Sequence, residues 1–300
     1  MANSIDIVTK AFEHRSQDPP PRGELWLGTE LLKKANLEDT LEGHVALIKR
    51  LGQDIICLPV SDERKMNEAL GYRYFDVPEL AKASGIDDLF VMALIDGPFQ
   101  QLAEKRGMMN VLTGWKRERH DFKKAYEQER VAVDMLIRQS LELSIDAIVV
   151  ADDMAGEHAP LMGPDDLQEL CSSFYTQAVS QIHSEHAYAL LHSCGNITKL
   201  IPQIVAYGFD GLAAIQHRTN DLIALKKLYG SSLTLMAGIG AELLEAPELS
   251  SFARKEYEGI VRALSPGGGF ILCSSSGLYA GRFLERVQEL YGIADTIYTG

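Results

Sequence analysis

The 300-residue sequence has little cysteine, little positive charge and no long hydrophobic run. Its four cysteines, Cys57, Cys171, Cys194 and Cys273, form no Cys-x-x-Cys pair, so we expect reduced thiols rather than a disulfide scaffold. The 42 acidic residues outnumber the 29 basic ones, and a net charge of −13 disfavours nucleic-acid binding. No apolar run reaches the roughly 20 residues of a membrane helix, and the N-terminus lacks the apolar segment of a secretory signal. We therefore expect a cytoplasmic protein that binds neither nucleic acid nor membrane.

Eight short apolar runs, each bounded by polar or turn residues, are the main structural signal. Apolar runs without alternation are typical of strands covered on both faces, as in a parallel sheet. Segments with helical periodicity lie between the runs, most clearly at 117–144, 164–184 and 250–264. The predicted strands lie at 25–28, 54–58, 90–95, 147–151, 188–192, 211–215, 233–237 and 269–273.

This alternation predicts an α/β fold, a single (β/α)8 TIM barrel spanning residues 24–300. Residues 1–23, which include the stretch Pro19–Pro21, are interpreted as an N-terminal extension and linker. An open doubly wound sheet is the alternative, but no G-x-G-x-x-G follows the first predicted strand. The segments 59–88 and 97–146 interrupt the alternation and are expected to lie near the mouth of the barrel.

Reactive groups of such barrels lie at the carboxyl ends of the strands and in the loops that follow. This rule selects a set of polar side chains along the whole sequence. The candidates are Glu30, Asp62, Asp96, Asp152, Asp153, His192, Cys194, Asn196, Gln216, His217, Glu242, Cys273 to Ser276, and Tyr279.

The segment His192-Ser-Cys194 carries the most chemical information. Residues two apart on a strand point to the same side, so the imidazole of His192 and the thiol of Cys194 are expected to project together. These two groups are half of a tetrahedral zinc site, although a packed histidine beside an inert thiol is the simpler alternative. Cys273, at the end of the last predicted strand, could be a third ligand if its strand phase turns it inward.

The other acidic candidates admit more than one interpretation. Asp153 and its neighbour Asp152 could orient a ligand, hold a histidine or cap a turn. Asp62 could be catalytic or could be an acid at a helix N-terminus. His217, with Arg218 beside it, could contact an anionic group or lie in a solvated loop.

From about residue 43 to 291 the sequence resembles the uroporphyrinogen decarboxylase superfamily. The resemblance rests on several segments that occur in the same order. They are Leu94-Ile-Asp-Gly-Pro-Phe99, Ile148-Val-Val-Ala-Asp-Asp153, His192-Ser-Cys-Gly-Asn196, Tyr207-Gly-Phe-Asp-Gly211 and Pro266-Gly-Gly-Gly-Phe-Ile-Leu272 with Ser276-Gly-Leu278. The resemblance implies a (β/α)8 barrel, in agreement with the strand count.

One branch of this superfamily decarboxylates uroporphyrinogen without a cofactor. Its arginine-rich R-Q-A-G-R segment holds the substrate carboxylates. The corresponding region here, residues 22–30, lacks both arginines of that motif. Asp62 matches the position of the central aspartate of that branch, so this branch is retained as an alternative.

The other branch moves methyl groups to or from a corrinoid protein, and the H-x-C-G-N segment resembles it most closely. The resemblance implies that His192 and Cys194 bind zinc, which activates a thiol or another methyl donor or acceptor. It also implies that the corrinoid is carried by a partner protein, which agrees with the lack of a glycine-rich nucleotide loop.

The third zinc ligand departs from the family pattern. The cysteine that follows strand eight in the family is replaced by Ser276, and Cys273 stands three residues earlier. A bulge could bring Cys273 to the metal, an acid such as Asp153 or Glu30 could replace it, or the site could lack a metal. We predict Cys273, because a thiolate is the better zinc ligand.

The sequence therefore predicts a corrinoid-dependent methyltransferase component that acts on a small methylated compound or thiol. The alternatives are a cofactor-free decarboxylase and a non-catalytic barrel that binds a tetrapyrrole or a partner. The predicted site comprises catalytic Asp62, Asp153 and His217, metal ligands His192, Cys194 and Cys273, and substrate-binding Glu30, Asp96, Phe99, Asn196, Gln216, Ser276 and Tyr279.

Overall fold

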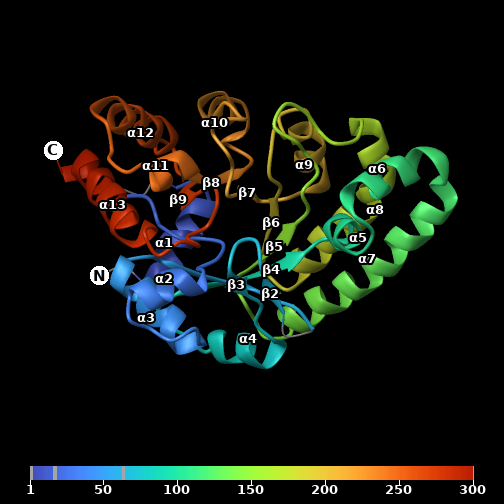
Figure 1. The fold of residues 1–300 in the computed structure, drawn as a ribbon, viewed down its shortest axis with the longest axis horizontal. Coiled ribbons are helices and arrows are strands. Elements are labelled where there is room, and N and C mark those ends of the chain that lie inside the picture. Colours follow the sequence, from blue (N-terminus) through green and yellow to red (C-terminus); the bar gives the residue numbers. More distant parts are fainter. Residues whose placement is uncertain (1–2, 16–18, 63–64, 300) are drawn as a thin grey trace.

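The computed structural model describes residues 3–15, 19–62 and 65–299 and has a curled parallel sheet at its centre. The seven strands follow one another around the sheet in sequence order, with helices surrounding them (Figure 1). They are β1 (Ile55–Pro59), β4 (Phe90–Asp96), β5 (Ala147–Ala151), β6 (Tyr188–His192), β7 (Gly211–Ala213), β8 (Thr234–Ile239) and β9 (Phe270–Ser274). Seven of the eight predicted strands are thus confirmed.

The first predicted strand, at 25–28, differs from the prediction. The chain there makes only isolated parallel bridges, between Arg22 and Leu272 and between Leu27 and Leu278. On its other side the amide of Asp54 donates to the carbonyl of Arg22 at 2.8 Å. The segment therefore lies between β9 and β1 without forming a ladder. Two reasons are local: the prolines at 19–21 lack the N–H that a ladder needs, and helix α2 begins at Thr29.

Helices connect the strands and cover the outside of the sheet. The predicted helices at 117–144, 164–184 and 250–264 are confirmed as α7, α8 and α12, with ends shifted by up to three residues. The helices are α1 (Ser4–Phe12), α2 (Thr29–Lys34), α3 (Leu41–Leu51), α4 (Val77–Ala83), α5 (Pro98–Arg106), α6 (Met108–Arg117), α7 (Arg119–Leu141), α8 (Pro164–Ser184), α9 (Ile201–Tyr207), α10 (Leu222–Tyr229), α11 (Ala241–Glu245), α12 (Ser251–Leu264) and α13 (Phe283–Thr299). None of these helices in the described part of the chain is long and apolar enough to span a membrane.

Each strand is buried on both faces, which explains why its sequence is apolar without alternation. In β4, Val91 and Ala93 pack towards the outer helices. Phe90, Met92 and Leu94 belong to a separate inner cluster enclosed by the sheet. In the observed register, Phe90 pairs with Ile55 of β1 and Met92 pairs with Ala147 of β5.

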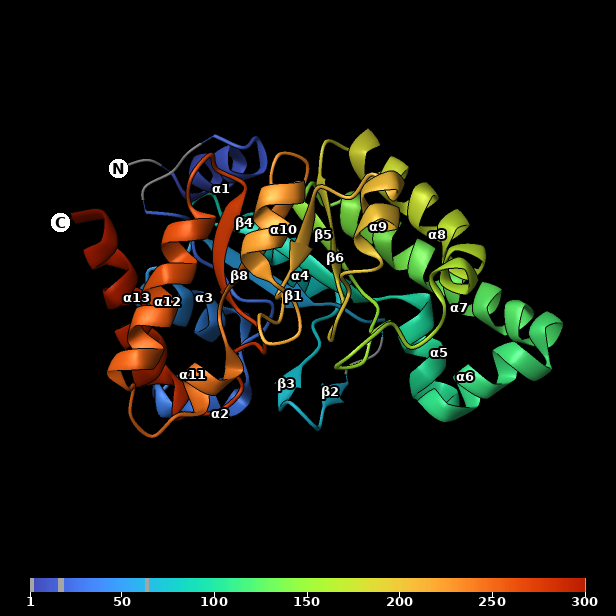
Figure 2. The same ribbon diagram turned by 90° about the horizontal axis from the view of Figure 1, so that it is seen from above.

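The amino end of the sheet is closed by α1. Phe12 stacks on Tyr188 and Phe90, the first residues of β6 and β4, with ring centroids 4.3 and 5.7 Å apart. At the opposite end lies the short antiparallel hairpin of β2 (Met66–Asn67) and β3 (Tyr72–Arg73), part of the predicted 59–88 interruption (Figure 2). A ligand site at the carboxyl end of the strands is therefore overhung by this hairpin, while the amino end is filled by side chains.

Candidate metal and substrate site

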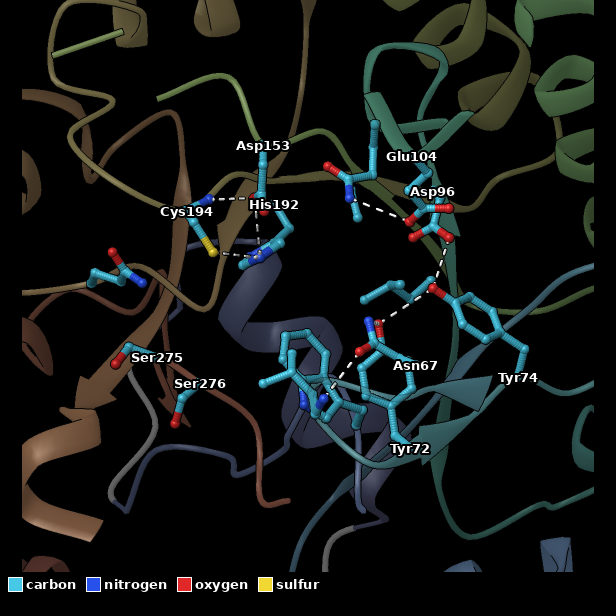
Figure 3. Close-up of a pocket in the computed structure, with 16 residues that line it drawn as sticks. Asn67, Tyr72, Tyr74, Asp96, Glu104, Asp153, His192, Cys194, Ser275 and Ser276 are labelled. Atoms are coloured by element: carbon cyan, nitrogen blue, oxygen red, sulfur yellow. Dashed lines mark hydrogen bonds and ion pairs between the residues drawn. The ribbon is translucent and has the colours of Figure 1, made fainter. Parts of the chain in front are cut away.

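A cavity of about 210 Å³ opens at the carboxyl end of the sheet. Its walls come from the 22–28 segment, the β2–β3 hairpin, α5 and the ends of β4, β5, β6 and β9 (Figure 3). The lining residues are Trp26, Asn67, Leu70, Tyr72, Tyr74, Leu94, Asp96, Gln100, Glu104, Ala151, Asp153, His192, Cys194, Gln216, Ser275 and Ser276.

His192 and Cys194 project together into this cavity, as their spacing predicts. Nε2 of His192 lies 3.7 Å from Sγ of Cys194. The other ring nitrogen of His192, Nδ1, is 2.8 Å from the carbonyl oxygen of Ala213 on β7. A carbonyl can only accept, so Nδ1 carries the proton and Nε2 presents its lone pair to the cavity. The imidazole is held in the tautomer that a metal ligand needs.

Asp153 completes a group of three possible metal ligands. Its Oδ1 accepts a hydrogen bond from the amide of Cys194 at 2.8 Å and lies 3.9 Å from Nε2 of His192. The ligand atoms of Asp153, His192 and Cys194 all lie within 4.8 Å of one another. One nitrogen, one thiol sulfur and one carboxylate oxygen are a donor set that zinc accepts, and three protein ligands leave a position for substrate.

The turn after β6 fixes the position of Cys194. Gly195 has a φ of +82°, and a Cβ there would lie 2.4 Å from the carbonyl oxygen of Ala155. The amide of Gly195 donates to Oε1 of Gln216 at 3.0 Å. Only glycine fits this close approach of two backbones, so the Gly in H-x-C-G-N has a structural cause.

The neighbouring carboxylate, Asp152, has a different role. It is fully buried and accepts hydrogen bonds from the amide of Gln100 at 2.7 Å and the hydroxyl of Tyr175 at 2.8 Å. Burial raises its pKa to about 7. Because Gln100 is in the first turn of α5, Asp152 anchors that helix to β5 and faces away from the cavity.

The expected third ligand, Cys273, lies elsewhere. It is fully buried inside the sheet, with Sγ 3.8 Å from Oε2 of Glu24, and burial raises the pKa of its thiol. It is neither among the cavity-lining residues nor in the group formed by Asp153, His192 and Cys194. Its side chain points into the inner hydrophobic cluster enclosed by the sheet, as the predicted strand phase required, but it does not reach the cavity.

The opposite side of the cavity carries a second polar group, of which Asp96, Glu104 and Tyr74 line the cavity (Figure 3). Lys65 reaches this group from the adjacent surface hollow. Oδ2 of Asp96 accepts hydrogen bonds from Tyr74 at 2.7 Å and from Lys65 at 3.1 Å. The ammonium of Lys65 is also 3.7 Å from Glu104 and 4.1 Å from the centre of the Tyr74 ring. Burial, followed by the charge of Asp96, raises the pKa of Tyr74.

Trp26 and Tyr72 form an aromatic wall of the same cavity. Trp26 stacks on Tyr72 with ring centroids 5.1 Å apart and meets the His192 ring edge-on at 5.9 Å. Burial raises the pKa of Tyr72 to about 12, so its hydroxyl stays protonated. The indole Nε1 of Trp26 is buried and has no acceptor among the described residues.

Three predicted site residues lie outside the cavity walls. Glu30 is exposed on α2 and pairs with Lys33 at 2.8 Å. Asp62 is exposed and lines a separate surface hollow behind Asp96. Phe99 is fully buried in the outer core, where it packs α5 against the sheet.

Three others are engaged in local contacts. Nε2 of His217 is 3.0 Å from Glu242. Partial burial would raise the pKa of that carboxyl, but the contacts with His217, its own backbone amide and Arg218 together lower it to about 2. The hydroxyl of Tyr279 donates to Glu245 at 3.0 Å. The side chain of Asn196 accepts from a backbone amide two residues later, which shapes the turn before α9. None of the three lines the cavity.

Asp96, Gln216 and Ser276, from the predicted substrate-binding set, do line the cavity. Sequence reasoning missed several other residues of its walls. They are Trp26, Asn67, Tyr72, Tyr74, Gln100 and Glu104, whereas Ser275 belongs to the predicted range 273–276. The aromatic stretch Gly71-Tyr-Arg-Tyr-Phe75 inside the 59–88 interruption was the available signal for the hairpin residues.

Comparisons with known proteins agree with this architecture. The family model described as "Uroporphyrinogen decarboxylase (URO-D)" matches residues 50–297. Two similar proteins, both called methylcobamide:CoM methyltransferase MtaA, are from Methanosarcina barkeri and its strain Fusaro, and are 24% and 22% identical over 216 residues. The matched part covers 70% of this chain but only 59% of those relatives.

A solved structure of a methyltransferase from Methanosarcina mazei has the same fold. Its TM-score is 0.74 at 16% identity, and the match covers 99% of this chain and 100% of that one. At this identity the similarity shows the fold alone.

Proposed function

This chain belongs to the uroporphyrinogen decarboxylase family, and we propose that it moves a methyl group between a small methylated compound or thiol and a corrinoid protein. The observation that carries the proposal is the group Asp153, His192 and Cys194, whose ligand atoms converge within 4.8 Å on the wall of the cavity. The similar proteins from Methanosarcina barkeri, which are named methylcobamide:CoM methyltransferases, support it.

The residues present fit a zinc ion. His192 offers Nε2 because Nδ1 donates to Ala213, the kind of supporting contact that orients metal-binding histidines. The amide of Cys194 donates to Asp153, which orients the carboxylate. Zinc at this place would supply a Lewis acid that keeps a bound thiol or alkoxide anionic near neutral pH.

The protein's own residues would position the reactants. The substrate heteroatom would lie at the open position beside His192 and Cys194, with its methyl group directed to the carboxyl-end opening. Trp26 and Tyr72 would exclude water from that heteroatom. In the transfer, the bond between the methyl group and the substrate heteroatom would break as the bond between the methyl group and cobalt forms, or the reverse.

We further propose that the 22–28 segment takes the place of the eighth strand and closes the barrel.

The decarboxylase alternative is less favoured by the cavity. Its volume of about 210 Å³ is below the about 300–1,000 Å³ of most ligand pockets, so it suits a compact ligand rather than a tetrapyrrole. Among the described residues, no arginine or lysine lines it. Arg22 is instead bound to Asp295 and stacked on Tyr291. Among the described residues, the ammonium next to the cavity belongs to Lys65, which is already paired with Asp96 and Glu104.

The test compares two cysteine variants that differ only in position. We expect about one zinc per chain in the wild type and in Cys273→Ser, and at least a tenfold loss of zinc affinity in Cys194→Ser and Asp153→Asn. Metal content is measured on folded protein, and methyl transfer is followed by the absorbance of a corrinoid. Zinc lost equally in Cys273→Ser would refute the assignment of Asp153. A zinc-loaded protein that transfers no methyl group to or from a corrinoid would refute the function.

A further inference from the structure

One residue beside the metal ligands has a strained backbone. Five non-glycine residues of the described chain have a positive φ, and four of them, His14, Asn36, Ser144 and His186, lie two or three residues after a helix ends. Such positions commonly adopt the left-handed conformation. The fifth, Ala214, has a φ of +54° directly after strand β7 and is fully buried. A strained conformation of this kind persists only where the surrounding structure holds it, and such residues cluster at functional sites.

The conformation of Ala214 bears on His192. The angle φ of a residue sets the orientation of the planar peptide unit that precedes it, and here that unit carries the carbonyl group of Ala213. This carbonyl is 2.8 Å from Nδ1 of His192 and accepts its proton, which leaves Nε2 free to bind a metal. An extended conformation at Ala214 would turn either this carbonyl or the following chain by more than about 90°.

The chain after Ala214 contacts the turn that carries the second metal ligand. Ala214 and the residue before it both belong to the inner cluster, whereas Ile215 packs in the outer core. Regular alternation would instead turn Ile215 towards the inside and Gln216 towards the outer helices. Because the alternation is broken, Gln216 lines the cavity. Its Oε1 accepts a hydrogen bond at 3.0 Å from the amide of Gly195, the residue after Cys194.

Asn220, in the same loop, holds the other side of that turn. Its Nδ2 donates to the carbonyl oxygen of Gly195 at 2.9 Å and to that of Gln216 at 3.0 Å. Its Oδ1 accepts from the amide of Ile197 at 3.1 Å, and the side chain is buried. Both polar groups of the Gly195 backbone are therefore bound by the loop that follows Ala214.

We propose that Ala214 is a positioning residue for the metal site. Its left-handed backbone directs the carbonyl of Ala213 to the imidazole of His192. It also directs Gln216 to the turn that carries Cys194. One strained alanine at the end of β7 thus orients a nitrogen ligand and a sulfur ligand at the end of β6. This inference rests on the proposed function, because the site that it concerns is the zinc site of the methyl transfer.

Zinc affinity is measured in two variants of Ala214. Glycine adopts a positive φ freely, so Ala214→Gly should keep the zinc affinity within about twofold. A β-branched residue at positive φ is a genuine outlier, so Ala214→Val should weaken zinc binding about 10–100-fold, as the loss of contacts that orient metal ligands does. If both variants bind zinc as tightly as the wild type, or if both lose it equally, the proposal is overturned.

The matched control for the added volume is Ala147→Val. Ala147 is another fully buried alanine of the inner cluster, it begins β5, and it has no positive φ. Ala147→Val should lower the melting temperature by overpacking and leave the zinc affinity unchanged. An equal loss of zinc affinity in Ala147→Val and Ala214→Val would show that packing, and not the backbone conformation, governs the site.

Variants of the partly buried Gln216 give a test that does not depend on the folding of Ala214→Val. Gln216→Met removes the acceptor of the Gly195 amide and should weaken zinc binding at least tenfold. Gln216→Glu keeps an acceptor oxygen and should retain the affinity. If Gln216→Met binds zinc as tightly as Gln216→Glu, the contact with Gly195 does not position Cys194 and the inference is wrong.

A measurement without zinc separates this inference from the proposed function. In metal-free protein at mildly alkaline pH, the side-chain nitrogen NMR shifts of His192, assigned with His192→Ala, report which ring nitrogen carries the proton. We expect Nδ1 in the wild type and in Ala214→Gly, and a change towards Nε2 in Ala214→Val. The same tautomer in all three would overturn the inference even if zinc binding and methyl transfer are found. The expected tautomers in a protein that transfers no methyl group would leave the inference standing and refute the function.

Discussion

Glu24 provides a stringent test of the physical reasoning, because it is a carboxyl group buried inside the sheet with 3% exposure. It accepts hydrogen bonds from the amide of Ser274 at 3.1 Å, from the Ser274 hydroxyl and from the hydroxyl of Tyr291 at 3.2 Å. These contacts fasten the 22–28 segment, which carries Trp26, to β9. Burial raises the pKa of Glu24 from 4.5 to about 7, although the hydrogen bonds oppose the change.

The sign of the pH dependence follows from that rise. The folded state binds this proton more tightly than the unfolded state does, so the free energy of unfolding falls as pH increases from about 4.5 to about 7. One pH unit corresponds to about 1.4 kcal/mol, so the whole effect is about 3 kcal/mol. Between pH 5 and pH 8 the single-site relation gives most of it, about 2–3 kcal/mol.

The variant that tests this effect is Glu24→Gln, which keeps the shape of the side chain and removes the carboxyl group that titrates. We expect the free energy of unfolding of the wild type, relative to that of the variant, to fall by about 2–3 kcal/mol from pH 5 to pH 8. Denaturant unfolding at the two pH values measures it, and exposed Glu30→Gln, compared in the same way, should show little change. If the free energies of unfolding of the wild type and Glu24→Gln differ by the same amount at pH 5 and pH 8, the buried carboxyl of Glu24 does not titrate as described and the prediction is wrong.

Two further outcomes follow from the geometry near the cavity. Gly195→Ala should lower the free energy of unfolding by about 2–4 kcal/mol in thermal unfolding, because φ is positive and the added Cβ meets the carbonyl of Ala155. The control Gly292→Ala, in α13 with open space around it, should instead stabilise the chain by about 0.5–1 kcal/mol. His217→Ala should leave zinc content and methyl transfer within about twofold in the same assays, because its contact is Glu242 outside the cavity. A tenfold loss would restore the predicted catalytic role of His217.

Features that depend on nearby residues were predictable from the sequence. The side-by-side placement of His192 and Cys194 follows from the two-residue period of a strand. The strands follow from burial on both faces, which leaves an uninterrupted apolar run. The helix α8, which begins at Pro164 with two acids in its first turn, follows from local helix chemistry.

The predictions that failed depend on distances between elements. Phe99 lies three residues beyond Asp96, the last residue of β4, yet it packs into the outer core while Asp96 reaches the cavity. Cys273 has the inward phase, but the layer at which it lies depends on the stagger of β9 against its neighbours. Neither stagger nor rotation after a strand end is encoded in a short motif.

The sequence by itself determined the order of strands and helices, the class of fold and the imidazole–thiol pair, because each arises from the periodicity of a single element. Only the tertiary structure decided that Asp153 joins this pair, that Asp152 anchors α5 instead, and that a hairpin brings Tyr72 and Tyr74 to the cavity. These choices depend on how neighbouring strands are staggered and where a loop folds back. Such relations arise from packing among segments far apart in the sequence, where local preference has no influence.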